Sequence, residues 1–206
     1  MTRRGGHGGV YGMNTAQQRR VVLGVTGSIA AYKAAELVRL MRKRDWQVRV
    51  IMTRAATRFV GELTFQTLSQ NPVAVEMFDP DVEWVPGHIA LADDADVMVI
   101  APCTANVMAK LAHGLADDLL SATALASGAP LVVAPAMNVK MWDHPATQAN
   151  LATLRGRGVR IVDVGVGDLA CGYEGKGRLA ELEDIMAAVA DVLEAGGGKA
   201  RGRKSK

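Results

Sequence analysis

A turn that pairs glycine with a hydroxyl stands at the end of the first apolar run of the chain. Val21–Val25 is apolar and rich in β-branched residues, Gly27 and Ser28 follow it, and helical spacing of apolar residues begins at Ile29. N–H groups at a helix N-terminus favour a phosphate dianion, and Ser28 adds a hydroxyl. The segment matches neither the Walker pattern nor the full dinucleotide fingerprint. By itself it fits a plain strand–helix turn as well as it fits a phosphate site.

Two later apolar runs also end in polar side chains. In 101–106, small residues would let a flat ligand approach the backbone, and Thr104 and Asn106 could hydrogen-bond to a heteroaromatic ring or its polar chain. Taken alone, the segment favours a plain helix cap formed by Thr104. In 134–142, Asn138 can both donate and accept hydrogen bonds, so it could hold a carboxylate without adding charge. The bulky apolar residues around Asn138 fit core or subunit packing equally well.

Two other segments carry groups that could move a proton. His88 precedes a predicted short helix, and an unperturbed imidazole titrates near neutrality, although His113 and His144 are equal candidates on chemistry alone. Cys171 lies in the glycine-rich stretch 170–178, which predicts a mobile loop of the kind that closes over substrates. Its thiol could supply a proton or act as a nucleophile, or it could be incidental.

Composition narrows the classes of protein. The chain has 206 residues, 49% of them hydrophobic and 22% charged, which predicts one globular domain. Residues 1–20 carry a formal charge of +4 and residues 195–206 carry +5, so the total of +3 leaves −6 between them. We therefore predict a mildly acidic domain at 20–194 between disordered basic tails at 1–19 and 195–206, with no nucleic-acid partner.

Several further classes are not expected. No apolar run is long enough to span a membrane, and no apolar region follows the basic N-terminus as in a secretory signal. Two distant cysteines and scattered histidines predict no metal site, and the hydrolase pattern G-x-S-x-G is absent. We expect a cytoplasmic protein with free thiols.

The elements that must position these groups alternate along the chain. Predicted strands are 21–25, 48–52, 73–78, 97–101, 131–134 and 159–162; predicted helices are 29–44, 55–69 in one or two pieces, 104–112, 118–127, 145–156 and 179–193. Such alternation predicts an α/β fold in three layers, a parallel sheet with helices on both faces. Ligands then bind beyond the carboxyl ends of the strands, where the polar segments stand.

Taken together and in this order, five segments resemble the flavin-dependent cysteine decarboxylases across residues 20–194. They are Thr26–Lys33, Gly87–Leu91, Ala101–Asn106, Pro135–Trp142 and Cys171–Arg178. The sequences Pro-Ala-Met-Asn and Cys-Gly-x-x-Gly-x-Gly-Arg are the specific parts. The resemblance implies a Rossmann-like, flavodoxin-type fold that binds FMN, and homo-oligomers, trimers or multiples of trimers, with each flavin near a subunit contact.

Within that family the chain is most similar to the branch that acts on 4′-phosphopantothenoylcysteine in coenzyme A biosynthesis. The implied reaction yields 4′-phosphopantetheine by flavin oxidation to a thioaldehyde, loss of CO₂ and re-reduction. Cys171 favours this branch, because the related peptidyl-cysteine decarboxylases stop at the enethiol. A peptidyl-cysteine decarboxylase and a non-catalytic flavin-binding regulatory subunit remain the alternatives. A separate or fused phosphopantothenate–cysteine ligase is an implied partner.

The resemblance also implies roles for single residues. Gly27 and Ser28 would hold the FMN phosphate; the full set of implied cofactor residues is Gly27, Ser28, Thr53, Thr104, Ala105, Asn106 and Ala136. His88 would be the base and Cys171 the proton donor of the reductive step. Asn138 would bind the substrate carboxylate, with further substrate contacts from Met137 and Lys176.

Overall fold

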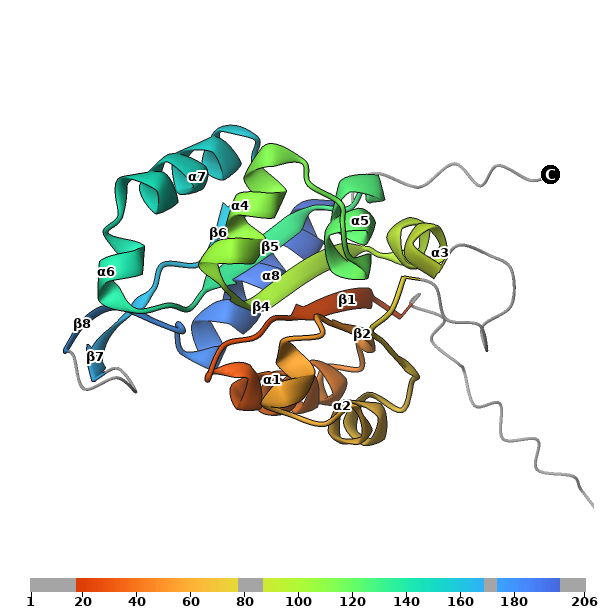
Figure 1. The fold of residues 1–206 in the computed structure, drawn as a ribbon. Helices are drawn as coiled ribbons and strands as arrows, with labels where there is room; N and C mark the ends of the chain where they lie inside the picture. Colours follow the sequence, from red (N-terminus) through yellow and green to blue (C-terminus); the bar gives the residue numbers. More distant parts are fainter. Residues whose placement is uncertain (1–17, 78–86, 169–173, 197–206) are drawn as a thin grey trace, which may run out of the picture.

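Six parallel strands form the central sheet of the computed structural model, which describes residues 18–77, 87–168 and 174–196 (Figure 1). The order across the sheet is β3-β2-β1-β4-β5-β6, and every neighbouring pair is parallel. The strands are β1 (Arg20–Val25), β2 (Gln47–Met52), β3 (Val73–Ala74), β4 (Val97–Cys103), β5 (Leu131–Pro135) and β6 (Arg160–Ile161). The predicted α/β parallel sheet of Rossmann-like type is therefore confirmed.

Helices cover both faces of this sheet, as predicted for a three-layer fold. They are α1 (Ala31–Lys43), α2 (Glu62–Ser69), α3 (Gly87–Asp94), α4 (Ala105–His113), α5 (Leu119–Ala126), α6 (Val139–Trp142), α7 (Pro145–Gly156) and α8 (Leu182–Gly196), with a 3₁₀ turn η1 at Ala56–Arg58. One apolar core joins the sheet to α1, α2 and α8, and a second joins it to α3–α7. All seven residues of β4 are buried, as a strand covered on both faces requires.

The order in which strands are added to the sheet reverses between β1 and β4. From β1 the connection through α1 leads to β2 on one side, whereas β4 and the strands after it lie on the other side. Connections that diverge in this way leave a crevice at the carboxyl ends of the two strands, which is where sheets of this class bind ligands.

The glycine-rich stretch was predicted as a loop, and this prediction is wrong for its second half. Residues Glu174–Arg178 form β8, which pairs antiparallel with β7 (Gly165–Asp168). The ladder supplies the hydrogen bonds that glycine-rich backbone would otherwise give to water. Residues 169–173, which include Cys171, lie outside the described part of the chain.

Three predicted boundaries also shift. The third strand is only Val73–Ala74, because it pairs with β2 alone at the edge of the sheet. The last helix begins at Leu182 instead of residue 179, because Leu179 and Ala180 are buried in the core as the chain leaves β8. It continues to Gly196, two residues past the predicted domain end.

Residues 1–17 and 197–206 of the predicted tails lie outside the described part of the chain. Among the described helices, none has the length and apolar character to cross a membrane.

Candidate functional site

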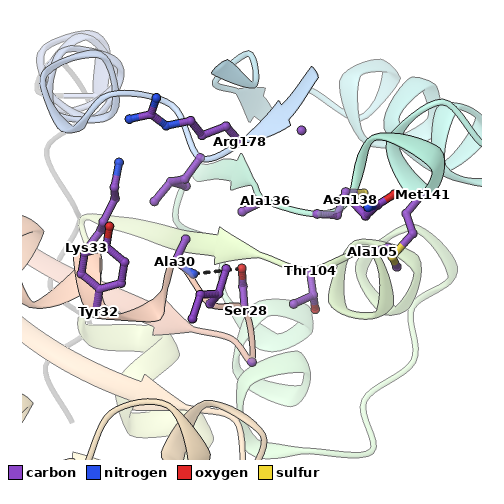
Figure 2. Close-up of a pocket in the computed structure, with 15 residues that line it drawn as sticks. Ser28, Ala30, Tyr32, Lys33, Thr104, Ala105, Ala136, Asn138, Met141 and Arg178 are labelled. Atoms are coloured by element: carbon purple, nitrogen blue, oxygen red, sulfur yellow. Dashed lines mark hydrogen bonds between the residues drawn. The ribbon is translucent and has the colours of Figure 1, made fainter. Parts of the chain in front are cut away.

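A cavity of about 560 Å³ opens at the carboxyl ends of β1, β4 and β5 (Figure 2). Its volume lies in the range of small-molecule and cofactor sites. The lining residues are Gly27, Ser28, Ile29, Ala30, Tyr32, Lys33, Thr104, Ala105, Ala136, Met137, Asn138, Met141, Gly177, Arg178 and Leu179. Three of the polar segments singled out in the sequence thus meet at the switch point of the sheet.

Gly27 is required by close packing at the first turn. A Cβ atom on Gly27 would lie 2.5 Å from the Cβ of Ala55 and 3.0 Å from its carbonyl carbon. The chain turns tightly here, with the N–H of Ser28 donating to the carbonyl of Thr26 at 2.8 Å, but the φ of Gly27 is not in the left-handed region, so the close approach of Ala55 is what requires glycine. The segment after β2 therefore lies against the turn. Thr53 belongs to that segment, where its N–H donates to the carbonyl of Val25 at 3.0 Å, but it does not line the cavity.

Thr26 joins the first turn to the second. Its side chain is buried; its hydroxyl donates to the carbonyl oxygen of Pro102 at 2.7 Å and accepts from the N–H of Thr104 at 3.0 Å. Both hydrogen bonds connect residues more than 70 positions apart in the chain. Sequence reasoning noted Thr26 only as part of a turn, because nothing local indicates this long-range role.

The two helices that start at the cavity begin differently. At α4, the hydroxyl of Thr104 caps the N-terminus by accepting from the N–H of Val107 at 3.4 Å. At α1, no side chain caps the N-terminus: the hydroxyl of Ser28 accepts from the N–H of Ala30 at 3.3 Å, before the helix begins, and its carbonyl accepts from the N–H of Ala31 at 2.9 Å. The start of α1 therefore offers the cavity the positive end of a helix without a capping side chain. Asn106, in the first turn of α4, is exposed and does not line the cavity.

The third segment is held between α6 and the β7–β8 hairpin. The Oδ1 atom of Asn138 accepts from the N–H of Lys140 at 2.8 Å and so caps α6. The N–H of the preceding Met137 donates to the carbonyl of Gly177 at 2.9 Å. With its oxygen fixed in the cap, the Asn138 amide group has a set orientation at the cavity, where its Nδ2 atom can only donate.

Gly177 lets the hairpin lie directly on this segment. Its φ is +133°, which disfavours other residues, and a Cβ atom there would lie 2.4 Å from the carbonyl oxygen of Met137. Arg178 and Leu179 follow and complete this side of the cavity. Lys176, predicted to contact substrate, is exposed and does not line the cavity; the part of the hairpin that lines it begins at the next residue, Gly177.

Ionisable groups near the site comprise one buried thiol and one cluster of a lysine with two aspartates. Burial raises the pKa of the Cys103 thiol, at the end of β4, to about 12, so this thiol stays protonated at neutral pH. Lys110 on α4 contacts Asp117 at 2.7 Å and Asp118 at 2.6 Å, and Asp118 caps α5 through the N–H of Ser121. Burial raises the pKa of Asp118, but hydrogen bonds from Lys110 and Ser121 outweigh it and hold that pKa below its usual value.

Two predicted catalytic residues, His88 and Cys171, lie partly or wholly outside the described part of the chain. His88 lies in the first turn of α3, but its side chain is not among the described ones, and Cys171 belongs to residues 169–173, outside the described part of the chain. Over the residues that can be described, no group of three or more His, Cys, Asp or Glu is arranged to hold a metal ion.

Sequence reasoning did not assign eight of the lining residues to a site: Ile29, Ala30, Tyr32, Lys33, Met141, Gly177, Arg178 and Leu179. Tyr32 and Lys33 had a usable signal, because they follow Ser28 within one to two helical turns. Leu179 had none, since only the path of the hairpin brings it to the cavity.

The fold and the cavity at the switch point define a Rossmann-like α/β domain with a ligand site at the strand ends. The model of the Flavoprotein family matches residues 12–194, and the chain belongs to that family. It is 47% identical over 175 residues to the coenzyme A biosynthesis bifunctional protein CoaBC of Haemophilus influenzae, covering 85% of this chain and 44% of that protein. The CoaBC of Bacillus subtilis is 49% identical over 168 residues, 82% of this chain and 41% of that protein.

Solved structures agree with this placement. A mutant PPC decarboxylase complexed with pantothenoylaminoethenethiol superposes with a TM-score of 0.76 at 32% identity, over 86% of this chain and all of that chain. The FMN-dependent cysteine decarboxylase SpaF gives a TM-score of 0.76 at 34% identity, over 87% of this chain and 98% of that chain. The chain thus spans less than half the length of the bifunctional relatives but nearly all of these decarboxylases.

Proposed function

We propose that the chain catalyses the FMN-dependent decarboxylation of 4′-phosphopantothenoylcysteine to 4′-phosphopantetheine, a step of coenzyme A biosynthesis. The observation that carries the proposal is the single cavity in which Gly27–Ser28, Thr104–Ala105, Ala136–Asn138 and Gly177 meet. These residues come from four of the segments on which the resemblance depends. The names of the bifunctional relatives and of the superposed PPC decarboxylase support the same reaction.

The described residues fit FMN. The α1 N-terminus has no capping side chain and suits a phosphate, with Gly27 and Ser28 beside it. Ala105, Ala136 and Gly177 leave room for a flat ring against the backbone. Bound there, FMN would supply reversible two-electron chemistry, which lets the reaction proceed without an external oxidant. Thr53 and Asn106 lie beside the described cavity, and their contacts to cofactor remain predictions.

The protein's own groups would bind the substrate and move its protons. The donor side of the Asn138 amide would hold the substrate carboxylate, next to Met137. His88 would accept the thiol proton, because an imidazole titrates in the working pH range. Cys171 would return a proton to carbon in the last step. Lys176 remains a predicted substrate contact that the described cavity does not reach.

A trimer, or a multiple of trimers, is the assembly we propose. Three apolar side chains at the cavity are largely exposed: Ile29 at 58%, Tyr32 at 61% and Met141 at 49%. A monomer would leave this apolar surface in water, whereas a subunit contact would bury it and enclose the flavin. We further propose a cytoplasmic location, and a phosphopantothenate–cysteine ligase, separate or fused, as the supplier of substrate.

The decisive experiment is mass spectrometry of the product formed from 4′-phosphopantothenoylcysteine by the purified protein. The expected product is 4′-phosphopantetheine. Cys171→Ser should release CO₂ but accumulate the enethiol, whereas His88→Asn should bind FMN and release none. Turnover only of peptides that end in cysteine would favour a peptidyl-cysteine decarboxylase. A protein that binds FMN but turns over neither substrate would contradict the proposal and favour a regulatory subunit.

A further inference from the structure

Two cationic side chains lie at one end of the cavity. Lys33 comes from the first turn of α1 and Arg178 from the end of β8, and both line the cavity. Figure 2 shows them on the side away from Asn138 and Met141. The cavity therefore has a cationic end and, opposite it, an end that is neutral and largely apolar.

Acidic side chains do not offset this charge within the described lining. The fifteen residues include Lys33 and Arg178 but no Asp or Glu. Arg178 has one ion pair, to Glu181 at 3.4 Å, but the side chains are 42% and 61% exposed, so the pair is weak. Glu36, one helical turn beyond Lys33, does not line the cavity and contacts Arg39 at 2.8 Å. The cationic end thus keeps an excess of positive charge that a bound anion can use.

The number and charge of the hydrogen-bond donors at the cationic end indicate which type of anion would bind there. A guanidinium, an ammonium and a helix N-terminus without a capping side chain together match a dianion with several oxygen atoms. A carboxylate needs fewer donors, and Asn138 at the other end already suits one. A phosphate monoester matches the cationic end best in both charge and number of acceptors.

We propose that Lys33 and Arg178 form a subsite for a phosphate monoester dianion. The inference rests on the proposed function, which offers two such groups, the phosphate of the cofactor and the phosphate at the far end of the substrate. Either source places a phosphate at the cationic end while the reacting end of the substrate lies toward Asn138. If the subsite binds the cofactor phosphate, removal of the cations weakens the binding of FMN. If it binds the substrate phosphate, their removal weakens the binding of the phosphorylated substrate or product.

The test measures binding without turnover, on Lys33→Met and Arg178→Met. Flavin fluorescence gives the affinity of the cofactor-free protein for FMN and for riboflavin. Calorimetry gives the affinity of the FMN-loaded protein for 4′-phosphopantetheine and for pantetheine. Each substitution should weaken one phosphorylated ligand about tenfold or more and leave its dephosphorylated form unchanged. Loss confined to FMN assigns the subsite to the cofactor; loss confined to 4′-phosphopantetheine assigns it to the substrate.

Lys43→Met is the matched control, because it removes the same charge from the far end of α1, outside the cavity. It should change none of the four affinities. Equal weakening of phosphorylated and dephosphorylated ligands, or no change for either phosphorylated ligand, would overturn the subsite. Failure of the proposed reaction is read separately, from the product of the wild-type protein.

Discussion

The cavity has two walls that are built on different principles. The turn wall consists of Gly27, Ser28, Thr104 and Ala105, where parallel strands pass into helices. The hairpin wall consists of Gly177, Arg178 and Leu179, which approach from an antiparallel ribbon outside the main sheet.

The two walls also differ in how they are held. Two buried hydrogen bonds of the Thr26 hydroxyl connect the two turns, whereas the hairpin wall rests backbone to backbone on Met137. A side-chain connection tolerates a close substitute of the same chemistry, but a backbone contact tolerates no added atom. The predictions below test this difference.

The largest effect is expected at Asn138, which caps α6 beside the hairpin wall. Asn138→Asp keeps an oxygen that can cap α6, because Asp and Asn are similar N-caps, so the fold should persist. The added negative charge would repel a substrate carboxylate, and we expect kcat/KM to fall by about a hundredfold or more, in line with about 3 kcal/mol for a lost charged hydrogen bond. FMN absorbance should remain. Unchanged kcat/KM would remove Asn138 from the proposed substrate site.

The next effect is expected in the hairpin wall. Gly177→Ala places a Cβ atom against the carbonyl oxygen of Met137 and keeps an unfavourable positive φ, so the free energy of unfolding should fall by about 2–3 kcal/mol. Chemical denaturation measures this loss. Gly156→Ala is the control, because a Cβ atom there meets nothing within 4 Å. If both variants are equally stable, the backbone contact does not hold the wall.

The turn wall should tolerate a conservative change and fail on a non-polar one. Thr26→Val leaves the Thr104 N–H and the Pro102 carbonyl without their partner in a buried place, at a cost of about 1–3 kcal/mol. Thr26→Ser keeps the hydroxyl and should lose less. Denaturation of the two variants, with FMN affinity as the second readout, checks the order. A serine variant as unstable as the valine one would indicate packing as the cause.

The smallest effect concerns the Lys110–Asp118 contact, which supports α4 behind the turn wall. Because its pKa is lowered in the folded state, ionised Asp118 stabilises the fold at pH values above the usual Asp pKa of about 4, and this stability is lost as pH falls through the lower folded value. Asp118→Asn should therefore cost less than about 1 kcal/mol at pH 7, and the difference from wild type should shrink below pH 4. Unfolding curves at both pH values measure it. A pH-independent difference would show that charge is not involved.

Much of the turn wall could be predicted from local pattern. Apolar β-branched runs such as Val21–Val25 form buried parallel strands, and parallel strands bring their carboxyl ends to one edge. The pattern therefore predicts one site for the polar residues after those runs, and Ser28, Thr104 and Asn138 line one cavity. The need for glycine at position 27 could not be predicted from the local pattern, because the close approach of Ala55 is a contact between segments that are separate in the sequence.

The hairpin wall could not be predicted in the same way. Three glycines between 172 and 177 favour a loop when only local freedom is considered, yet residues 174–178 form a strand. The partner strand β7 and the carbonyl of Met137 decide that outcome, since they pair with the backbone and leave no room for a side chain.

The sequence by itself determined the kind of sheet, the edge at which ligands bind and three polar groups of the site, Ser28, Thr104 and Asn138, because periodicity and turn chemistry are local properties. The tertiary structure alone decided that Thr26 connects two turns, that Leu179 closes the cavity and that Lys33 and Arg178 share one end of it. These are distances between segments up to about 150 residues apart, and only the packed chain sets them.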